Sequence, residues 1–238
     1  MKCCICDTDI FFGAFYIDSW GNAAHGHHVI EHCPACDRII GQSSSLGKIN
    51  YSDGRFLCGH CFKFENPVQE TKQIELAYFN ARKLLSEKGF DFPKKIKVSL
   101  VSREVFGEAG YPDTVLGMNT SQIGILEQTH HVKVLFGLPL TLCSGVIAHE
   151  ILHVWQHDKG LNPEPMICEG LCELGAGLVY KRTKTPLGER LFENIEKNMI
   201  AVYSDGFKAM RNLLETKGWQ AVRDHVKENS KKHSFINR

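Results

Sequence analysis

Hydrophobic residues recur three or four positions apart in several parts of the chain, and each such stretch predicts a helix. The clearest one runs from Ile74 to Leu85, and Gly89 is a plausible helix end shortly after it. The C-terminal part of the chain carries longer apolar stretches. We expect further helices over residues 141–158, 164–181 and 187–228, the last one broken near Ser204-Asp205-Gly206 and at Gly218.

Three segments between the first helix and the others are typical of strands. KIKVSLV at residues 95–101 predicts one strand. QIGILEQ at 122–128 and HVKVLFG at 131–137 alternate, and together they predict a hairpin that turns at Thr129-His130. This interpretation puts His130 and His131 on the hairpin surface and not among metal ligands. Strand 122–128 or 131–136 is a candidate edge for pairing with an extended substrate.

The first 65 residues have a different pattern. They are rich in Cys, His, Gly and aromatic residues, and short alternating segments such as FFGAFYI suggest small hairpins. A linker near Glu65-Asn66-Pro67 closes this stretch, because the residue before a proline avoids the helical region. We therefore expect an α+β protein with a small module at 1–66 and a mostly helical domain with a small β-sheet at 67–238.

Composition narrows the class of protein. The chain has 238 residues, a formal net charge of +1 and 43% hydrophobic residues, which predicts a globular protein with a real core. A balance so close to neutral argues against a nucleic-acid binder that works by bulk electrostatics. No apolar run reaches the ~18 residues of a membrane helix, and the start lacks the pattern of a signal peptide. We expect a cytoplasmic protein with no nucleic-acid or membrane partner.

The ten cysteines are concentrated at the N-terminus, where CxxC occurs three times. In a reducing compartment this spacing indicates metal binding in preference to disulfides or a redox pair. Pairs of ligands two residues apart bind zinc tetrahedrally with no open position. The spacing predicts two structural zinc ions, one held by Cys3, Cys6, His25 and His28, the other by Cys33, Cys36, Cys58 and Cys61.

The exact ligands of the first ion stay open, because Cys4, His27, His32 and His60 are also nearby in the sequence. His32, directly before Cys33, is the alternative to His28 as the fourth ligand. A closed zinc site is structural, so the module is expected to bind a protein partner or to brace the second domain. The arrangement resembles a LIM domain, from which it departs in the type and position of this fourth ligand.

The sequence His-Glu-Ile-Leu-His at 149–153 is an HExxH motif inside an apolar helical stretch. Residues four apart share one face of a helix, so His149 and His153 can bind the same ion, with Glu150 beside its open position. His157 continues the series, but eight residues of helix span about 12 Å, too far for the same ion. The candidates for a third ligand are Glu164, Glu169 and Glu173.

The segment EGLCELGAGLVY resembles the gluzincin layout HExxH…ExxxD/E. This resemblance implies that Glu169 is the third zinc ligand and that Glu173, one turn later, orients a ligating histidine from outside. Zinc would lower the pKa of a water towards ~7, and Glu150 would take its proton and later deliver it to the leaving amine. Tyr203 is a candidate donor to the oxyanion.

The combination of the two parts resembles the DA-one family of LIM-bearing, ubiquitin-regulated peptidases and their short bacterial relatives. The matching segments are the CxxC at 3–6, WGNAAHGHH, HCPACDRII, YSDGRFLCGHC, GLP, AHEILHVW and CEGLCEL. The resemblance implies a zinc metallopeptidase with one catalytic and two structural zinc ions, whose LIM-like part recognises partners or substrates. The plant members carry ubiquitin-interacting motifs, of which we see none here, so ubiquitin dependence is not carried over.

Two hypotheses follow from the sequence. The first is a zinc peptidase acting on protein or peptide substrates, and it predicts three zinc ions per chain. The alternative is a non-catalytic LIM-like interaction protein on an inactive peptidase scaffold, with two. The sequence gives neither the substrate, the cleavage preference, the activation mode nor the oligomeric state.

Overall fold

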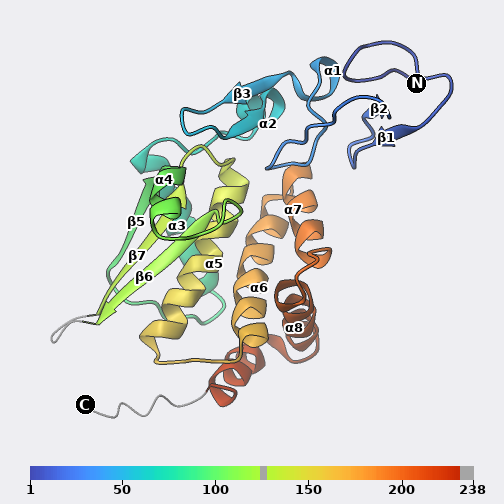
Figure 1. Cartoon of the computed structure of the whole chain (residues 1–238). Coiled ribbons are helices and arrows are strands. Elements are labelled where there is room, and N and C mark those ends of the chain that lie inside the picture. Colours follow the sequence, from blue (N-terminus) through green and yellow to red (C-terminus); the bar gives the residue numbers. More distant parts are fainter. Residues whose placement is uncertain (124–127, 231–238) are drawn as a thin grey trace. The chain divides into compact units, whose positions relative to one another are not determined.

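The computed structural model describes residues 1–123 and 128–230. The chain divides into two compact units. The first comprises Met1–Val68 together with Gly137–Leu140, and the second comprises Gln69–Phe136 and Thr141–Arg238. Short strands and turns dominate the first unit, and long helices dominate the second, so the chain is a mixed α+β protein (Figure 1).

The first unit is built on two small antiparallel hairpins, β1–β2 and β3–β4. Its elements are β1 (Phe15–Ile17), β2 (Ala23–His25), α1 (Gln42–Ser45), β3 (Lys48–Asn50), β4 (Phe56–Cys58) and α2 (Gly59–Phe64). The hairpins expected in this stretch are therefore confirmed. Each strand has only three residues, and two-stranded sheets of this size are marginal on their own.

Two turns in this unit repeat the same backbone geometry. The amide of Asp7 donates to the carbonyl of Cys3 over 2.8 Å, and the amide of Asp37 donates to Cys33 over 2.8 Å. Asp7 and Asp37 both have positive φ angles, 59° and 62°, a conformation that Asp tolerates better than most residues. Each of the first two CxxC pairs is thus followed by a left-handed residue that turns the chain back towards the two cysteines.

A buried aspartate joins the two halves of this unit. Asp18 accepts hydrogen bonds from the amides of Trp20 (2.9 Å), Asn22 (2.9 Å) and Ile39 (2.8 Å). The apolar cluster around it is small and contains Cys4, Ala24 and Ile39. A core of this size supplies little hydrophobic stabilisation, so other interactions must hold the unit together.

Residues 137–140 belong to this unit although they come from the middle of the chain, which the sequence pattern did not indicate. The hydroxyl of Tyr51 donates to the carbonyl of Gly137 over 2.8 Å. The amides of Gly137 and Val68 donate to Val68 and Leu138 over 2.6 and 2.8 Å. This short ladder is the point at which the chain returns to the first unit before α5 begins.

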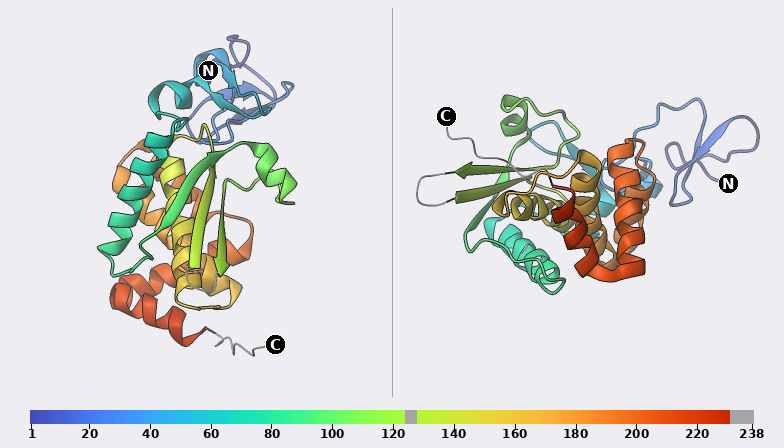
Figure 2. Two further views of the ribbon diagram at one scale, coloured as in Figure 1. Left: turned by 90° about the vertical axis from the view of Figure 1, so that its left-hand side faces the viewer. Right: turned by 90° about the horizontal axis from the view of Figure 1, so that it is seen from below.

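The second unit is a three-stranded sheet with helices on one side of it. Its elements are α3 (Thr71–Ser86), β5 (Ile96–Val101), α4 (Arg103–Glu108), β6 (Gly117–Ile123), β7 (Gln128–Leu135), α5 (Leu140–Asp158), α6 (Pro165–Thr183), α7 (Pro186–Glu196) and α8 (Ala201–Glu228). The strand order is β5-β7-β6, with β5 parallel and β6 antiparallel to β7. Helices α5, α6 and α8 lie on the same side of the sheet (Figure 1, Figure 2).

The expected helices and the first expected strand are confirmed. In α3 the periodic residues Ile74 and Leu85 are completely buried, and Gly89 has a φ of 88° just beyond the helix. The core of this unit includes Trp155 of α5, whose ring meets Phe90 edge-on at 5.0 Å. This unit therefore has a hydrophobic core of its own. None of the helices in the described residues is long and apolar enough to cross a bilayer.

The predicted hairpin exists, but its turn was misplaced. Thr129 and His130 lie inside β7, where they pair with Gln122 and Ser121 of β6. Residues 124–127 of the expected strand 122–128 lie outside the described residues. Because β7 pairs on both sides, the prediction that 131–136 is an edge strand is wrong. Among the described strands, β5 and β6 are the two edges of this sheet.

The surface position expected for His130 is also wrong. Its side chain is 2% exposed, on the same face of β7 as the buried Val132 and Val134. Its Nδ1 lies 2.8 Å from the hydroxyl of Ser121. This partner on the neighbouring strand offsets part of the cost of burying the imidazole. His131, on the opposite face of the strand, lies 2.8 Å from the hydroxyl of Ser99 through Nε2.

The helix break expected at Ser204-Asp205-Gly206 is wrong as well. These residues lie within α8, and the chain leaves the helical conformation earlier, between Glu196 and Ala201. Gly206 is inside the helix for a packing reason, because a Cβ there would overlap the carbonyl oxygen of Met166 in α6 and press on Gly170. The break at Gly218 is confirmed, since this residue has a φ of 78° within α8.

Candidate metal centres

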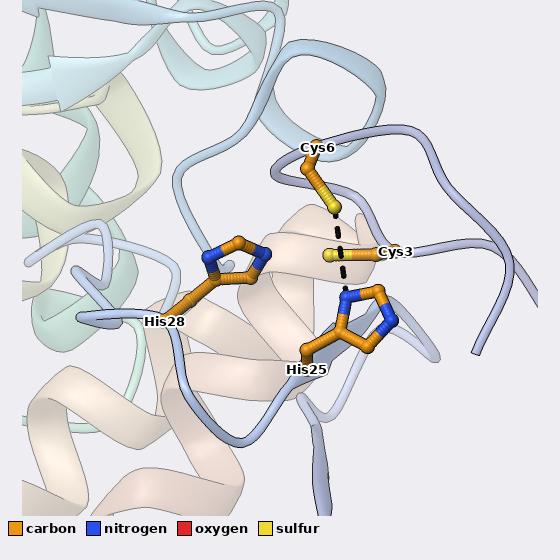
Figure 3. A group of neighbouring side chains, drawn as sticks. All are labelled: Cys3, Cys6, His25 and His28. Carbon is orange, nitrogen blue, oxygen red and sulfur yellow. Dashed lines mark hydrogen bonds between the residues drawn. The ribbon is translucent and has the colours of Figure 1, made fainter. Parts of the chain in front are cut away.

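The first candidate centre brings together the four side chains predicted for the first structural zinc. The ligand atoms of Cys3, Cys6, His25 and His28 all lie within 4.8 Å of one another. Figure 3 shows them approaching one another from different sides, with Sγ of Cys6 3.5 Å from Nδ1 of His25. Among the described residues, Nε2 of His28 is buried and has no hydrogen-bond partner. A buried polar nitrogen without a hydrogen-bond partner is expected of a residue that serves as a metal ligand.

The local charge at this cluster suits a cation. Burial opposes ionisation of Cys3, but the amides of Cys6, His25 and Ile5 are aimed at its sulfur and lower its pKa to about 5. A thiolate is the form that binds zinc. Cys6 is exposed and both histidines are half-buried, so this cluster lies near the surface of its unit.

The second candidate centre is the four-cysteine cluster of Cys33, Cys36, Cys58 and Cys61, all of them buried. The amide of Cys58 donates to Sγ of Cys33 over 3.4 Å, and the amide of Cys61 donates to Sγ of Cys58 over 3.3 Å. The sulfurs of Cys36, Cys58 and Cys61 lower the pKa of Cys33. All ten cysteines, which lie within the described residues, are free thiols. The donor set fits zinc, which favours thiolates in a tetrahedral arrangement.

The other histidines and cysteines of this unit lie outside the two clusters. Nδ1 of His32 is 3.0 Å from the carbonyl oxygen of Asp37. Cys4 is buried in the small apolar core. His27 packs against the ring of His28, with ring centres 4.4 Å apart. Trp20, to which the sequence assigned no separate role, donates from Nε1 to the carbonyl of Cys36 over 2.7 Å and so supports the second CxxC turn.

The third candidate centre lies between α5 and α6 of the second unit. Nε2 of His149 is 3.1 Å from Nε2 of His153, one helical turn later. Oε2 of Glu169 on α6 is 3.3 Å from the first nitrogen and 3.6 Å from the second. Two glycines allow this approach of the helices, since a Cβ at Gly145 would overlap Tyr180 and one at Gly175 would overlap Leu152.

These three atoms are spaced as zinc ligands would be. Tetrahedral ligands at about 2.1 Å from zinc are about 3.4 Å from one another, and the measured distances of 3.1, 3.3 and 3.6 Å straddle that value. Burial works against the charge of Glu169, but the two imidazoles outweigh it and hold the pKa of this carboxyl well below its usual range. Three protein donors leave a fourth position free for a further ligand, as in catalytic zinc sites.

Two cysteines of α6 are also near these histidines. Sγ of Cys172 lies within 4.8 Å of a ring nitrogen of His149 and of His153. Sγ of Cys168 likewise lies within 4.8 Å of ligand atoms of His153 and Glu169. Burial raises the pKa of the Cys172 thiol well above its usual value. The ionised carboxylate of Glu169 is the better third donor.

The second nitrogen of each histidine ring has its own partner. Nδ1 of His149 is 3.5 Å from Oε1 of Glu173, and Nδ1 of His153 is 3.6 Å from Sγ of Cys168. Cys168 in turn donates to Oε1 of Gln156 over 2.9 Å. Such contacts turn the rings so that the Nε2 atoms face the same point. Sequence reasoning assigned a role to Glu173 through a motif, but it assigned none to Cys168 or Gln156.

Glu150 lies beside this centre and is 7% exposed. Its Oε2 accepts a hydrogen bond from Nδ2 of Asn119 in β6 over 3.0 Å, a contact that the sequence did not indicate. His157 is exposed and lies 3.2 Å from the hydroxyl of Ser121, outside the group of ligand atoms. Glu164 is at the N-cap of α6, also outside the group.

A cavity of about 490 Å³ opens next to Glu150. It is lined by residues around Val115, by α5 and α6, and by Asn198, Ile200 and Tyr203, and the lining includes His149 and Glu173. Burial, and then the neighbouring carboxylates, raise the pKa of Tyr203. Its phenol is therefore protonated at neutral pH and available as a hydrogen-bond donor. A molecule bound in this cavity would be in reach of the lining side chains Glu150 and Tyr203.

Comparison with known proteins gives one family match. Residues 71–180 match the model of the DA1-like family, described as Protein DA1. Protein DA1 of Arabidopsis thaliana is 23% identical over 85% of this chain and 49% of its own length. The LIM domain-containing protein HDR3 of Oryza sativa subsp. japonica is 20% identical over 87% of this chain and 56% of its own length. Protein DA1-related 2 of A. thaliana is 24% identical over 63% of this chain and 35% of its own length.

The chain is similar to DA1-like proteins. These matches support a relationship with that family, and the chain spans about half the length of the curated relatives it matches. No solved structure matches it. A relative with a named LIM domain, together with the two Cys-rich clusters, supports a zinc-binding protein.

Proposed function

We propose that the chain is a zinc-dependent peptidase that hydrolyses peptide bonds in proteins or peptides. One observation carries this proposal. Three donor atoms with zinc-ligand spacing, a buried carboxylate beside them and a cavity next to that carboxylate occur together in one unit. This combination is what hydrolysis by an activated water requires. The match to the DA1-like family, over residues 71–180, includes the three donors and Glu150.

A zinc ion held by His149, His153 and Glu169 would acidify a water and polarise the carbonyl of the substrate. Glu150 takes a proton from the water and passes it to the nitrogen of the departing amine. Asn119 holds one oxygen of Glu150 in place through its amide. The phenol of Tyr203 donates a hydrogen bond to the carbonyl oxygen as negative charge develops on it.

The edge of the sheet supplies a way to hold an extended substrate. Gly117, the first residue of β6, and Leu116 before it line the cavity beside Glu150. An unpaired strand edge can add a further strand through backbone hydrogen bonds. Pairing of the substrate with β6 would place its backbone across the open side of the candidate centre.

The first unit would serve recognition, with two structural zinc ions in closed sites. Its surface carries exposed aromatic residues in one segment, including Phe11 (77% exposed), Phe12 (96%) and Tyr16 (55%). Aromatic side chains exposed together are a common feature of protein-binding surfaces. The same observation would favour a non-catalytic interaction protein, so catalysis has to be tested separately. We also propose that the protein acts in the cytoplasm.

Replacement of Glu150 tests the peptidase directly. Glu150→Gln keeps the shape and the contact with Asn119 but removes the base, so hydrolysis should fall about 10²- to 10⁴-fold. Wild type and variant are expressed in the native host, and new protein N-termini are compared by mass spectrometry. Glu164→Gln, outside the cluster, is the matched control. Metal analysis should give three zinc ions per chain for all three proteins; equal activity of Glu150→Gln, or two ions in wild type, would contradict the proposal.

A further inference from the structure

The cavity beside Glu150 has walls that favour one class of substrate. We infer that it binds a large apolar side chain of the substrate, carried by the residue whose nitrogen becomes the leaving amine. This inference rests on the proposed peptidase function and adds a substrate preference to it. It uses the chemistry of the lining, the volume of the cavity and the place of Glu150 in its wall.

The lining is apolar on several sides. Leu116 precedes β6, Leu142 and Val146 come from α5, and Ala176 comes from α6. Ile200, directly before α8, completes the apolar group. Such walls give water few hydrogen bonds, so an apolar group that displaces it gains free energy.

Charged side chains of a substrate would find poor partners here. Among the lining residues, all of them in the described part of the chain, none is Lys or Arg. An acidic side chain would instead meet the carboxylates of Glu150 and Glu173. Both carboxylates already have partners, because Glu150 accepts from Asn119 and Glu173 lies 3.5 Å from Nδ1 of His149. A basic side chain would have to lose its hydration without gaining a free counter-ion.

The volume suits a bulky group. A cavity of about 490 Å³ leaves room for an aromatic ring or a branched side chain. Tyr180 fixes one wall, since it is 6% exposed and packs against Gly145 so closely that no Cβ would fit there. The wall on this side is therefore rigid.

The position of Glu150 in the wall of the cavity determines which substrate side chain occupies it. Glu150 passes its proton to the leaving nitrogen, so this nitrogen must come within hydrogen-bond reach of the carboxylate. Glu150 and His149 line the cavity, whereas His153 does not. The side chain attached next to the leaving nitrogen is thus the one nearest to the cavity. The preference should concern the residue directly after the cleaved bond.

A peptide series tests this with the zinc-loaded protein. The peptides share one sequence and carry Phe, Leu, Ala, Lys or Asp directly after the cleaved bond. The kcat/KM values for Phe and Leu should exceed that for Ala by about 10- to 200-fold, and Lys and Asp should be poorer still. Cleavage without a preference at this position, or a preference for Lys or Asp, would overturn the inference and leave the peptidase function standing.

Two neighbouring residues give a matched pair of variants. Ile200 lines the cavity and is 58% exposed, so Ile200→Trp narrows the cavity without disturbing a packed core. Met199, 98% exposed and outside the lining, provides the control Met199→Trp. Ile200→Trp should lower kcat/KM at least tenfold for the Phe peptide and far less for the Ala peptide, and Met199→Trp should change neither. The same loss in both variants would overturn the inference.

Binding to the zinc-loaded Glu150→Gln variant separates this inference from catalysis. Calorimetry should give a Kd for the Phe peptide at least tenfold lower than for the Asp peptide, and addition of Ile200→Trp should remove the difference. If wild type cleaves none of the peptides but this difference is present, the proposed function fails and the apolar cavity is supported. If the two peptides bind equally, the cavity is not a side-chain site and the inference is overturned.

Discussion

The four-cysteine cluster of the first unit and the His149–His153–Glu169 cluster of the second differ in the number of protein donors and in what surrounds them. All four cysteines are buried, and their sulfur atoms lie within 4.8 Å of one another. The second cluster has three donor atoms within 3.6 Å of one another and borders a cavity of about 490 Å³. Four donors leave a zinc ion no free position, whereas three leave one. This difference supports our proposal of a structural role for the first cluster and a catalytic role for the second.

The two units also differ in the size of the hydrophobic core that stabilises each of them. The first has strands of three residues and an apolar cluster of mainly small side chains. The second buries large side chains such as Trp155, Phe106 and Phe207 between long helices. We expect a metal to be necessary for folding in the first unit and dispensable for folding in the second.

Cys61→Ser should have the largest effect on folding. Structural zinc contributes about 10–16 kcal/mol in small zinc-dependent folds, and one lost thiolate leaves three buried cysteines without a complete site. Hydrogen exchange should rise throughout residues 1–68 and stay unchanged in α5 and α6. Cys143→Ser, at a buried cysteine of α5 outside the three clusters, is the control and should not affect residues 1–68. A protected first unit in Cys61→Ser would mean that its core suffices without this ion.

His153→Ala should remove the metal from the second unit without unfolding it. We expect the zinc content to fall from three ions to two and peptidase activity to be lost, because two donors hold zinc poorly. Far-UV circular dichroism should keep its helical signal. The control is His157→Ala, which changes an exposed histidine one turn further along α5 and should retain three ions. Loss of the helical signal in His153→Ala would make this centre structural too.

The sequence predicted residues that act through local spacing and missed those that act across elements. The CxxC pairs and HExxH have spacings set within a turn or a single helical turn, so their members meet wherever the element lies. Asn119 contacts Glu150 from 31 residues away in the sequence, and Asp18 contacts Ile39 from 21 residues away. The periodicity of residues within one helix or strand gives no information about contacts between residues so far apart in the sequence.

The fold errors have related causes. The hairpin turn was placed at Thr129-His130 because these residues join two alternating segments, yet His130 is buried beside Ser121 of the neighbouring strand. Gly206 suggested a helix break, but it is a contact point with Gly170 of α6. In both positions a partner on another element overrides the local preference. Periodic stretches such as Ile74–Leu85 were predicted correctly because burial follows the period itself.

Tyr203→Phe tests whether the cavity beside the His149–His153–Glu169 cluster takes part in catalysis. The four-cysteine cluster has no corresponding donor, because a closed zinc site binds no substrate. The phenol is half-buried and protonated, and its loss should lower kcat about 10²- to 10³-fold, the usual cost of one oxyanion donor. KM and zinc content should stay near the wild-type values. Tyr16→Phe, an exposed tyrosine of the first unit, is the control. An unchanged kcat in Tyr203→Phe would remove this residue from the mechanism.

Cys168→Val tests the contacts behind the open centre, and its expected effect is the smallest. The sulfur lies 3.6 Å from Nδ1 of His153 and donates to Gln156, so it orients the ring without binding the metal itself. Loss of such a partner typically weakens metal affinity about 10- to 100-fold. Competition with a chelator measures this affinity, and Cys168→Ser should restore part of it because a hydroxyl can also accept from Nδ1.

Cobalt substitution distinguishes this role from direct ligation by the sulfur. Cys61→Ser is unsuitable as a background, because its first unit is expected to unfold, so the comparison uses the cobalt-loaded wild type and Cys168→Val. A cysteine ligand gives an intense sulfur-to-cobalt absorption band, to which both Cys-rich clusters contribute in each protein. If Cys168 only orients His153, the intensity of this band per bound cobalt should not fall in Cys168→Val. A drop equivalent to one thiolate would make Cys168 a ligand, and the second unit would then bind its metal with four protein donors, as the first unit does.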